Sequence, residues 1–178
     1  MTDFSYTPLF QKGPDSTSYR HIGREGVDSV EWEGESFLRV RPQALIELSR
    51  QAFIDVAHFL RSAHLESLAH ILKDPEASDN DHIVARELLQ NAIIAAEGVF
   101  PGCQDTGTAC IMGVRGDHVL VSGDDAEHLS QGVFRAYRER NLRYSQVAPL
   151  TMYEEKNTGN NLPAQIDLFA GKGDSYHF

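Results

Sequence analysis

The alternation of apolar and polar residues divides the first half of the chain into a short strand region followed by helices. Residues 27–40 alternate on both sides of Gly34, which is typical of a β-hairpin. Pro42 then stands where the first turn of a helix accepts proline. Beyond it, apolar residues recur at steps of three and four, which predicts an amphipathic helix. Its expected apolar face consists of Leu45, Leu48, Ala52, Val56 and Phe59.

The same spacing predicts two further helices before the middle of the chain. A short one covers residues 65–72, and the polar stretch "KDPEASDND" separates it from the next. Ser78 or Asp79 can cap the longer helix, which ends before Gly98 and Pro101. We expect its apolar face to consist of Val84, Leu88, Ala92 and Ala95.

Strand and helix signals follow one another in the second half of the chain. Residues 109–123 predict a strand, a tight turn in which Gly116 supplies a positive φ, and a second strand. Asp124 or Asp125 then begins a helix, and "NLRYSQVAPLTMYEEKNTGNNLP" predicts a long polar loop. Residues 164–170 predict the last strand, with "GDSYHF" as the start of its hairpin partner. The inward face of the helix is expected to hold Ala126, Leu129, Val133, Ala136 and Tyr137.

These elements predict an α+β fold, in which an N-terminal helical layer precedes a mixed β-sheet with a packed helix. Residues 1–26 are rich in Gly, Ser, Pro and Thr, and we expect them to form an extended N-terminal arm. The length of 178 residues fits one domain.

Charge and cysteine content narrow the classes of function. The net charge of −10 argues against a nucleic-acid-binding protein, because phosphates are neutralised by a basic surface, but it leaves room for a local anion site. The N-terminus lacks the features of a signal peptide, and the apolar runs are too short to span a membrane. Cys103 and Cys110 are too few for a disulfide framework, and their spacing matches no common zinc pattern. We therefore expect a cytoplasmic protein with reduced thiols.

The stretch "PGCQDTGTAC" (101–110) is unusually polar for a connection between a helix and a strand. Cys103 is a nucleophile only if a base approaches it in space, and a metal ligand only if other ligands join it. The sequence "DTGT", which begins at Asp105, matches an aspartyl protease loop, but such a site needs a second aspartate and an apolar strand before the loop. An ordinary polar turn also fits, so the spacing alone leaves all four interpretations open.

Arginines and histidines supply the other candidate groups. Arg138 and Arg140 stand at the end of a predicted helix, where the helix dipole accounts for them. Arg143 comes where the helix gives way to the long loop, and its guanidinium could bind a carboxylate with two hydrogen bonds. His58, His64 and His70 are six residues apart, which scatters them around a helix, so we expect surface or boundary positions and no metal-binding role. 

Several motifs together resemble the N-terminal part of the class I fumarases, which are iron–sulfur fumarate hydratases related to the tartrate dehydratases. "CQDTGT" followed about forty residues later by "NLRYSQ" is the most specific pair. The resemblance runs from about Tyr19 to the last residue. The other motifs that carry it are "RQAF", "DPEASDND" and "MYEEKNTGNNLPAQIDLF".

The resemblance implies a cytoplasmic, homodimeric hydro-lyase that interconverts fumarate and L-malate, a reaction of the tricarboxylic acid cycle. It also implies a four-iron four-sulfur cluster held by three cysteines, of which Cys103 is the first. Gln104 and Arg143 would bind the dicarboxylate substrate, and Asp105 would act as a catalytic residue in proton transfer. Cys110 falls outside the ligand pattern, and we expect it to be a small core residue.

The two other cluster cysteines of the family have no counterpart before Phe178. The resemblance therefore makes residues 27–178 part of the N-terminal cluster-binding domain of an iron–sulfur hydro-lyase, apparently truncated. We expect the parent chain to be an enzyme and these 178 residues alone to hold no cluster and to show no hydratase activity. The alternatives are an inactive fragment, an assembly or split-enzyme partner, and a hydratase of a related dicarboxylate such as tartrate.

Overall fold

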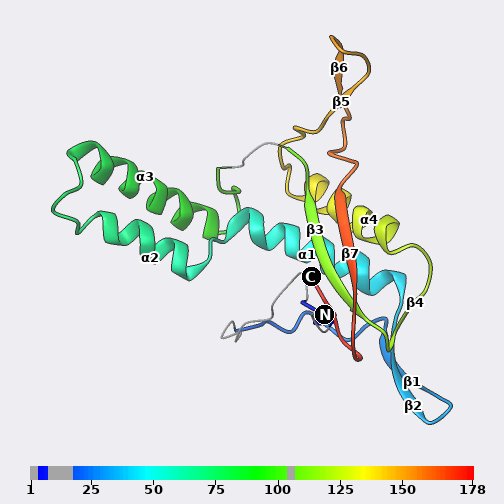
Figure 1. The fold of residues 1–178 in the computed structure, drawn as a ribbon. Coiled ribbons are helices and arrows are strands. Elements are labelled where there is room, and N and C mark those ends of the chain that lie inside the picture. The colour runs from blue at the N-terminus through cyan, green and yellow to red at the C-terminus, as the bar shows by residue number, and fades with distance from the viewer. Residues whose placement is uncertain (1–3, 8–17, 104–106) are drawn as a thin grey trace.

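The computed structural model describes residues 4–7, 18–103 and 107–178, and it confirms the predicted α+β class (Figure 1). Within these residues, a hairpin leads into three helices, which are followed by two strands, a fourth helix and four further strands. In chain order the elements are β1 (Val27–Trp32), β2 (Glu35–Val40), α1 (Pro42–His58), α2 (Ser62–Ile71), α3 (Asp79–Ala96), β3 (Cys110–Gly116), β4 (Val119–Val121), α4 (Asp125–Glu139), β5 (Val147–Pro149), β6 (Glu155–Asn157), β7 (Gln165–Gly171) and β8 (Tyr176–His177).

In the described ranges, six of the strands form two mixed sheets of three strands each. β2 pairs antiparallel with β1 and parallel with β4, whereas β3 pairs parallel with β7 and antiparallel with β8. The predicted β1–β2 hairpin is confirmed, and Glu33 and Gly34 form its turn with φ values of 52° and 85°. Two positive φ angles give a two-residue turn the twist that matches its strands. β5 and β6 pair within the stretch expected to be a loop, because strands of three residues leave too little alternation to detect.

Two predicted strand pairings are wrong. β3 and β4 follow one another in the chain but lie in separate sheets, and β8 pairs with β3 rather than with β7. Gly116 does not have a positive φ; instead, a Cβ atom there would lie 2.0 Å from the carbonyl oxygen of Gly173. The Gly116 amide donates to the Ser175 carbonyl at 3.0 Å. Glycine is therefore required at 116 because the segment before β8 crosses it closely.

The core lies where α1 and α4 meet the sheets. Leu129, Val133 and Ala136 of α4 are almost fully buried, as their spacing predicts, whereas Ala126 is exposed. Asp124 caps the helix by accepting from the amides of Ala126 and Glu127. The remaining buried members of the core cluster are Val40, Leu45, Ala109, Ile111 and Val119.

Asp125, the first residue of α4, is buried although it is charged. Its carboxylate accepts a hydrogen bond from Arg115 of β3 at 3.0 Å and another from the hydroxyl of Tyr176 in β8 at 2.8 Å. Burial raises the pKa of Tyr176, and the hydrogen bond to Asp125 raises it further. These contacts join β3, β8 and the start of α4 through one carboxylate.

Helices α1 and α4 pack closely against one another at Gly132. A Cβ atom on Gly132 would lie 1.8 Å from Ser49 Oγ and 2.3 Å from the carbonyl oxygen of Ile46. Ser49 Oγ, itself buried, donates to the Leu45 carbonyl at 2.9 Å. This contact lies on the buried face of α1, which comprises Leu45, Ile46, Ser49, Ile54 and His58.

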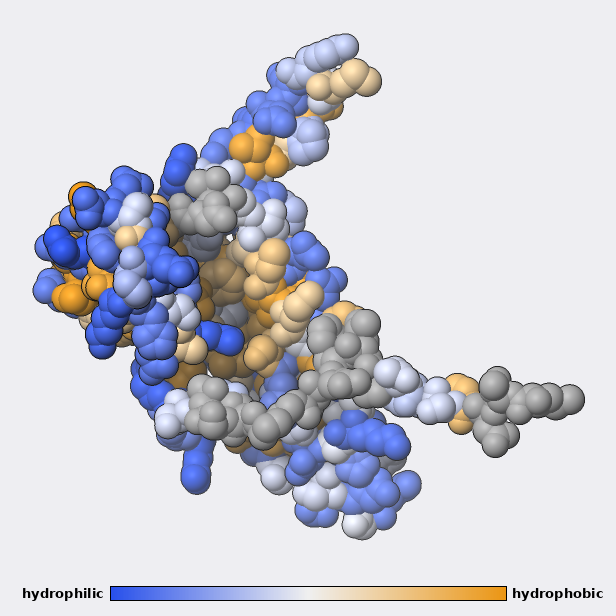
Figure 2. Space-filling view, turned by 60° about the vertical axis from the view of Figure 1, so that its left-hand side comes forward, coloured by the Kyte–Doolittle hydropathy of each residue, from blue (hydrophilic) through white to orange (hydrophobic). Residues whose placement is uncertain are grey.

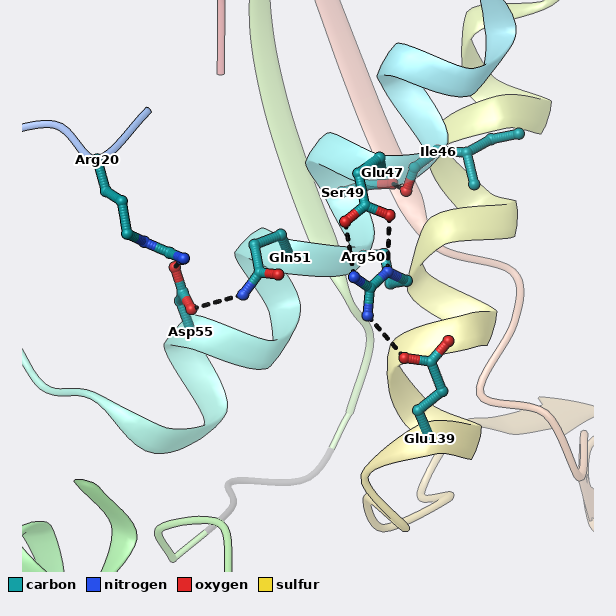
Figure 3. A network of polar contacts seen from close by, with 8 residues as sticks. All are labelled: Arg20, Ile46, Glu47, Ser49, Arg50, Gln51, Asp55 and Glu139. Carbon is teal, nitrogen blue, oxygen red and sulfur yellow. Dashed lines mark hydrogen bonds and ion pairs between the residues drawn. The ribbon is translucent and has the colours of Figure 1, made fainter. Parts of the chain in front are cut away.

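The predicted apolar face of α1 is wrong for its second half. Val56 and Phe59 are 68% and 56% exposed, whereas His58, expected at the surface or its boundary, is buried. Ion pairs on the outer side of α1 reinforce its position (Figure 3). Arg50 donates to both carboxylate oxygens of Glu47, at 2.8 and 2.6 Å, and to Glu139 of α4 at 2.7 Å. Hydrogen bonding to Glu47 is the main reason why the pKa of Arg50 is raised.

Helices α2 and α3 form a hairpin that projects from the rest of the molecule (Figure 1). Ser78 caps α3 as predicted, in a reciprocal arrangement with Asp81. The hydrogen bonds from Ser78 lower the pKa of Asp81. Of the predicted face of α3, Ala95 is buried, whereas Val84 and Leu88 are 47% and 44% exposed.

We predict that Gly132→Ala lowers the free energy of unfolding by about 1–3 kcal/mol, the usual cost of overpacking a core. Alanine favours helices by about 1 kcal/mol over glycine, but the overlap with a backbone oxygen outweighs this gain. Urea unfolding followed by circular dichroism measures the change. Gly23→Ala is the matched control, because nothing lies within 4 Å of a Cβ atom there. Unchanged or increased stability of the Gly132 variant would contradict the proposed contact.

Candidate functional site

Cys103 lies in the connection between α3 and β3, which is tied to both α1 and α3. The Cys103 amide donates to Asn91 Oδ1 of α3 at 3.1 Å, and the Gly102 amide donates to the Ala57 carbonyl of α1 at 2.8 Å. Cys103 is exposed and its thiol is free. The other two predicted site residues of this stretch, Gln104 and Asp105, lie outside the described residues.

The far end of the same connection is tied to the long segment after α4. The Gly107 carbonyl accepts a hydrogen bond from Asn161 Nδ2 at 3.4 Å. Thr108 Oγ1 donates to Gln146 Oε1 at 2.9 Å. The connection that carries Cys103 is thus held from α3 at one end and from residues 146 and 161 at the other.

Arg143, the predicted carboxylate-binding residue, begins that segment. Leu142 before it is 6% exposed, and the Leu142 amide donates to the Tyr137 carbonyl at the end of α4. On the other side, the ring of Tyr144 stacks on that of Tyr137 with centroids 6.3 Å apart. The backbone on both sides of Arg143 is therefore fixed, while the Arg143 residue itself is exposed.

The structure brings the Cys103 connection and the Arg143 segment together through Asn161. Its side-chain oxygen accepts hydrogen bonds from the amides of Ser145 and Gln146, both at 2.9 Å. Its side-chain nitrogen donates to Gly107 at 3.4 Å. One amide side chain therefore contacts both segments that carry predicted site residues.

A hollow of about 510 Å³ opens beside Cys103. Figure 2 shows apolar side chains on its floor, between the α2–α3 hairpin and the rest of the molecule. A volume of roughly 300–1,000 Å³ is usual for small-molecule sites. Part of the exposed apolar face of α1 lines this hollow, together with α3 and both cysteines; the residues concerned include Val56, Phe59, Leu88, Ala92, Cys103 and Cys110.

His58 is a buried polar residue in the wall of this hollow. Its Nδ1 atom lies 2.7 Å from the Ile54 carbonyl oxygen, so Nδ1 carries the hydrogen and donates. Its Nε2 atom is buried and has no hydrogen-bond partner among the described residues. Its spacing on α1 did not reveal this burial, which is seen only in the folded structure.

Cys110 is exposed at the start of β3, so the expectation of a core residue is wrong. Its Sγ atom lies 3.5 Å from the Thr108 carbonyl oxygen and 3.9 Å from Gln165 Oε1. Within the described part of the chain, no group of three or more His, Cys, Asp or Glu side chains is placed to hold a metal ion.

Sequence reasoning did not identify Asn91, Gln146 and Asn161 as residues that hold the site. Asn91 follows Leu88 by three residues and precedes Ala95 by four, so a polar residue interrupts an apolar stripe. That interruption is a usable signal. The asparagines of "NTGNN" read as turn residues, and nothing local separates Asn161 from Asn160.

The sequence model of one family, described as fumarate hydratase (fumerase), matches residues 46–178. The chain therefore belongs to the fumarate hydratase family. It is 53% identical over 181 residues to "Fumarate hydratase 1, mitochondrial" of Leishmania major, covering 100% of this chain and 33% of that protein. It is also 53% identical over 175 residues to "Fumarate hydratase class I, aerobic" of Escherichia coli (strain K12), covering 98% of this chain and 32% of that protein.

The chain thus spans about a third of the length of the curated relatives it matches. None of the helices in the described ranges is both long enough and apolar enough to cross a membrane.

We predict that Asn91→Ala speeds hydrogen exchange at the Cys103 amide about two- to tenfold, as expected for a net hydrogen-bond contribution of about 0.5–1.5 kcal/mol. Gln90→Ala is the matched control, since Gln90 is a neighbouring exposed residue of the same helix. Exchange read by mass spectrometry or NMR measures the change. Equal exchange in the two variants would show that Asn91 does not hold the Cys103 connection.

Proposed function

We propose that this chain forms part of an iron–sulfur-dependent fumarate hydratase that interconverts fumarate and L-malate by reversible hydration. The observation that carries the proposal is the link between the Cys103 connection and the Arg143 segment, at the edge of a hollow large enough for a small dicarboxylate. The identity of 53% to named fumarate hydratases supports the same reaction. Residues 27–178 would belong to the cluster-binding domain, and residues 1–26 would form an N-terminal arm.

Cys103 would supply one thiolate of a four-iron four-sulfur cluster. Its exposure at the hollow and its free thiol suit this role, and the other ligands would come from outside the described residues. When bound, such a cluster supplies a Lewis acid that polarises a substrate oxygen.

The protein side chains would bind the substrate and move its protons. The Arg143 guanidinium would bind one substrate carboxylate with two parallel hydrogen bonds. Gln104 would contact the substrate as well, and the Asp105 carboxylate would take up or release the proton at the carbon next to the hydroxyl-bearing carbon. The apolar side chains around the hollow would exclude water and strengthen these charge interactions.

A second candidate is an assembly or split-enzyme partner that acts only with another polypeptide. It is favoured by the incomplete set of metal-binding side chains in the described residues. We also propose a homodimer in the cytoplasm, for which the two free thiols suit a reducing compartment.

Anaerobic reconstitution with iron and sulfide tests the proposal directly. The full-length protein that contains this chain should gain cluster absorbance and hydrate fumarate faster than it dehydrates tartrate, whereas residues 1–178 alone should do neither. Turnover of tartrate but not fumarate would replace the proposed substrate. If the full-length protein turns over neither substrate, the hydratase proposal fails and the second candidate, an assembly or split-enzyme partner, is favoured.

Substitution of the two cysteines should separate their roles in the reconstituted full-length protein. We predict that Cys103→Ser abolishes or strongly destabilises the cluster, because a hydroxyl is a poor substitute for a thiolate ligand. Cys110→Ser should leave cluster content and hydration largely intact, which makes it a matched control from the same hollow. Cluster absorbance and electron paramagnetic resonance measure the outcome. Equal losses in both variants would remove the distinction between the two thiols.

Arg143→Lys should raise KM for fumarate about tenfold or more, because an ammonium group cannot reproduce the two-pronged contact of a guanidinium. Arg138→Lys is the matched control, since Arg138 lies on α4 over the ring of Phe134, 5.7 Å from its centroid. Steady-state kinetics of the loaded enzyme measure KM and kcat. Unchanged kinetics in the Arg143 variant would remove it from the substrate site.

A further inference from the structure

Asn161 is the most completely enclosed polar residue in the described ranges, with 0% of its surface exposed. Its side-chain oxygen accepts from two consecutive amides, those of Ser145 and Gln146, at 2.9 Å each. Its side-chain nitrogen donates to the Gly107 carbonyl at 3.4 Å. A buried amide that uses both of its ends in this way is costly to replace, because each lost partner leaves a buried polar group unsatisfied.

The loop around Asn161 is shaped to present this side chain. Asn161 adopts a φ of +56°, a conformation that asparagine tolerates better than most residues. Asn160 Oδ1 accepts from the Leu162 amide at 3.0 Å, and Asn157 Nδ2 donates to the Tyr144 carbonyl at 2.7 Å. The neighbouring asparagines therefore stabilise the loop or hold it to the Arg143 segment, while Asn161 alone among these three also contacts the Cys103 connection.

We infer that Asn161 is a positioning residue that sets the distance between the Cys103 thiol and the Arg143 guanidinium. The effect of Asn161 on catalysis rests on the proposed function. Its role in joining the two segments does not. Cys103 follows α3, and Arg143 follows α4, so no single helix or strand connects the two residues. The Asn161 bridge joins their segments from the buried side, and the Thr108–Gln146 hydrogen bond at 2.9 Å joins them as well.

A dicarboxylate held at one end by a metal centre and at the other by an arginine reacts only if both ends are correctly spaced. Displacement of a bound group by about 1 Å can cost roughly a hundredfold in rate. Loosening the bridge should therefore lower kcat in a protein that still folds and still carries Arg143.

The chemistry of the amide allows the two halves of the bridge to be separated. Asn161→Asp keeps the shape and the acceptor for Ser145 and Gln146, but it removes the donor to Gly107 and turns a carboxylate oxygen toward that carbonyl. Asn161→Gly removes both halves and tolerates the positive φ, so it also serves if the aspartate variant does not fold. Asn160→Asp is the matched control, because its carboxylate can still accept from Leu162.

Hydrogen exchange and thiol alkylation in the full-length protein test the structural part. Asn161→Asp should speed exchange in residues 107–109 and alkylation of Cys103 at least threefold, while the Ser145 and Gln146 amides stay protected. Asn161→Gly should release both segments, and Asn160→Asp should release neither. Unchanged exchange in residues 107–109 of the aspartate variant, or the same release in the Asn160 control, would overturn the inference.

Kinetics of the cluster-loaded enzyme test the positioning part. Asn161→Asp should lower kcat about tenfold or more, measured at a temperature at which circular dichroism shows the variant fully folded. Release of residues 107–109 with unchanged kcat and KM would show that the bridge is merely structural and would overturn the positioning role. If the unsubstituted full-length protein hydrates no dicarboxylate, the proposed function fails, and the exchange and alkylation results still decide whether Asn161 couples the two segments.

Discussion

The contact between Gly132 of α4 and Ser49 of α1 is the constraint on which the rest of the structure depends. It lets the two helix backbones come closer than any side chain at 132 would allow. The C-terminal end of α1 holds Gly102 through the Ala57 carbonyl, and the end of α4 leads directly to Arg143. The helix crossing therefore fixes the two places from which the cysteine and the arginine extend.

The α1–α4 crossing fixes the approximate positions of the two segments that carry Cys103 and Arg143. Hydrogen bonds of asparagine and glutamine side chains then fix these segments relative to one another. Helix packing positions the helix backbones, but the connection after α3 and the segment after α4 are no longer helical where they contact one another. Asn91 and Asn161 hold the two ends of the Cys103 connection, and Gln146 adds a third contact. Amide side chains suit this task because they donate and accept at once without bringing a charge next to the thiol.

Local signals predicted the elements whose causes are local. The Glu33–Gly34 turn, the Ser78 cap and the buried positions 129, 133 and 136 depend on a few neighbouring residues, and all agree with the structure. Strand pairing failed because β4 and β8 pair with strands distant in sequence. The predicted apolar face of α1 was wrong in its second half, where Val56 and Phe59 are exposed and His58 is buried. Within the site, Cys103 and Arg143 could be chosen from the sequence, but Asn161 is distinguished only by burial in three dimensions.

The buried carboxylate of Asp125 has a consequence for the order of events during synthesis. It opens α4, yet one of its two hydrogen-bond donors, Tyr176, is made some fifty residues later. A nascent chain that has just completed α4 has only Arg115 to compensate this charge. The start of α4 is thus fully satisfied only when β8 leaves the ribosome and pairs with β3. Packing of the helix is thereby coupled to arrival of the strand that closes the sheet.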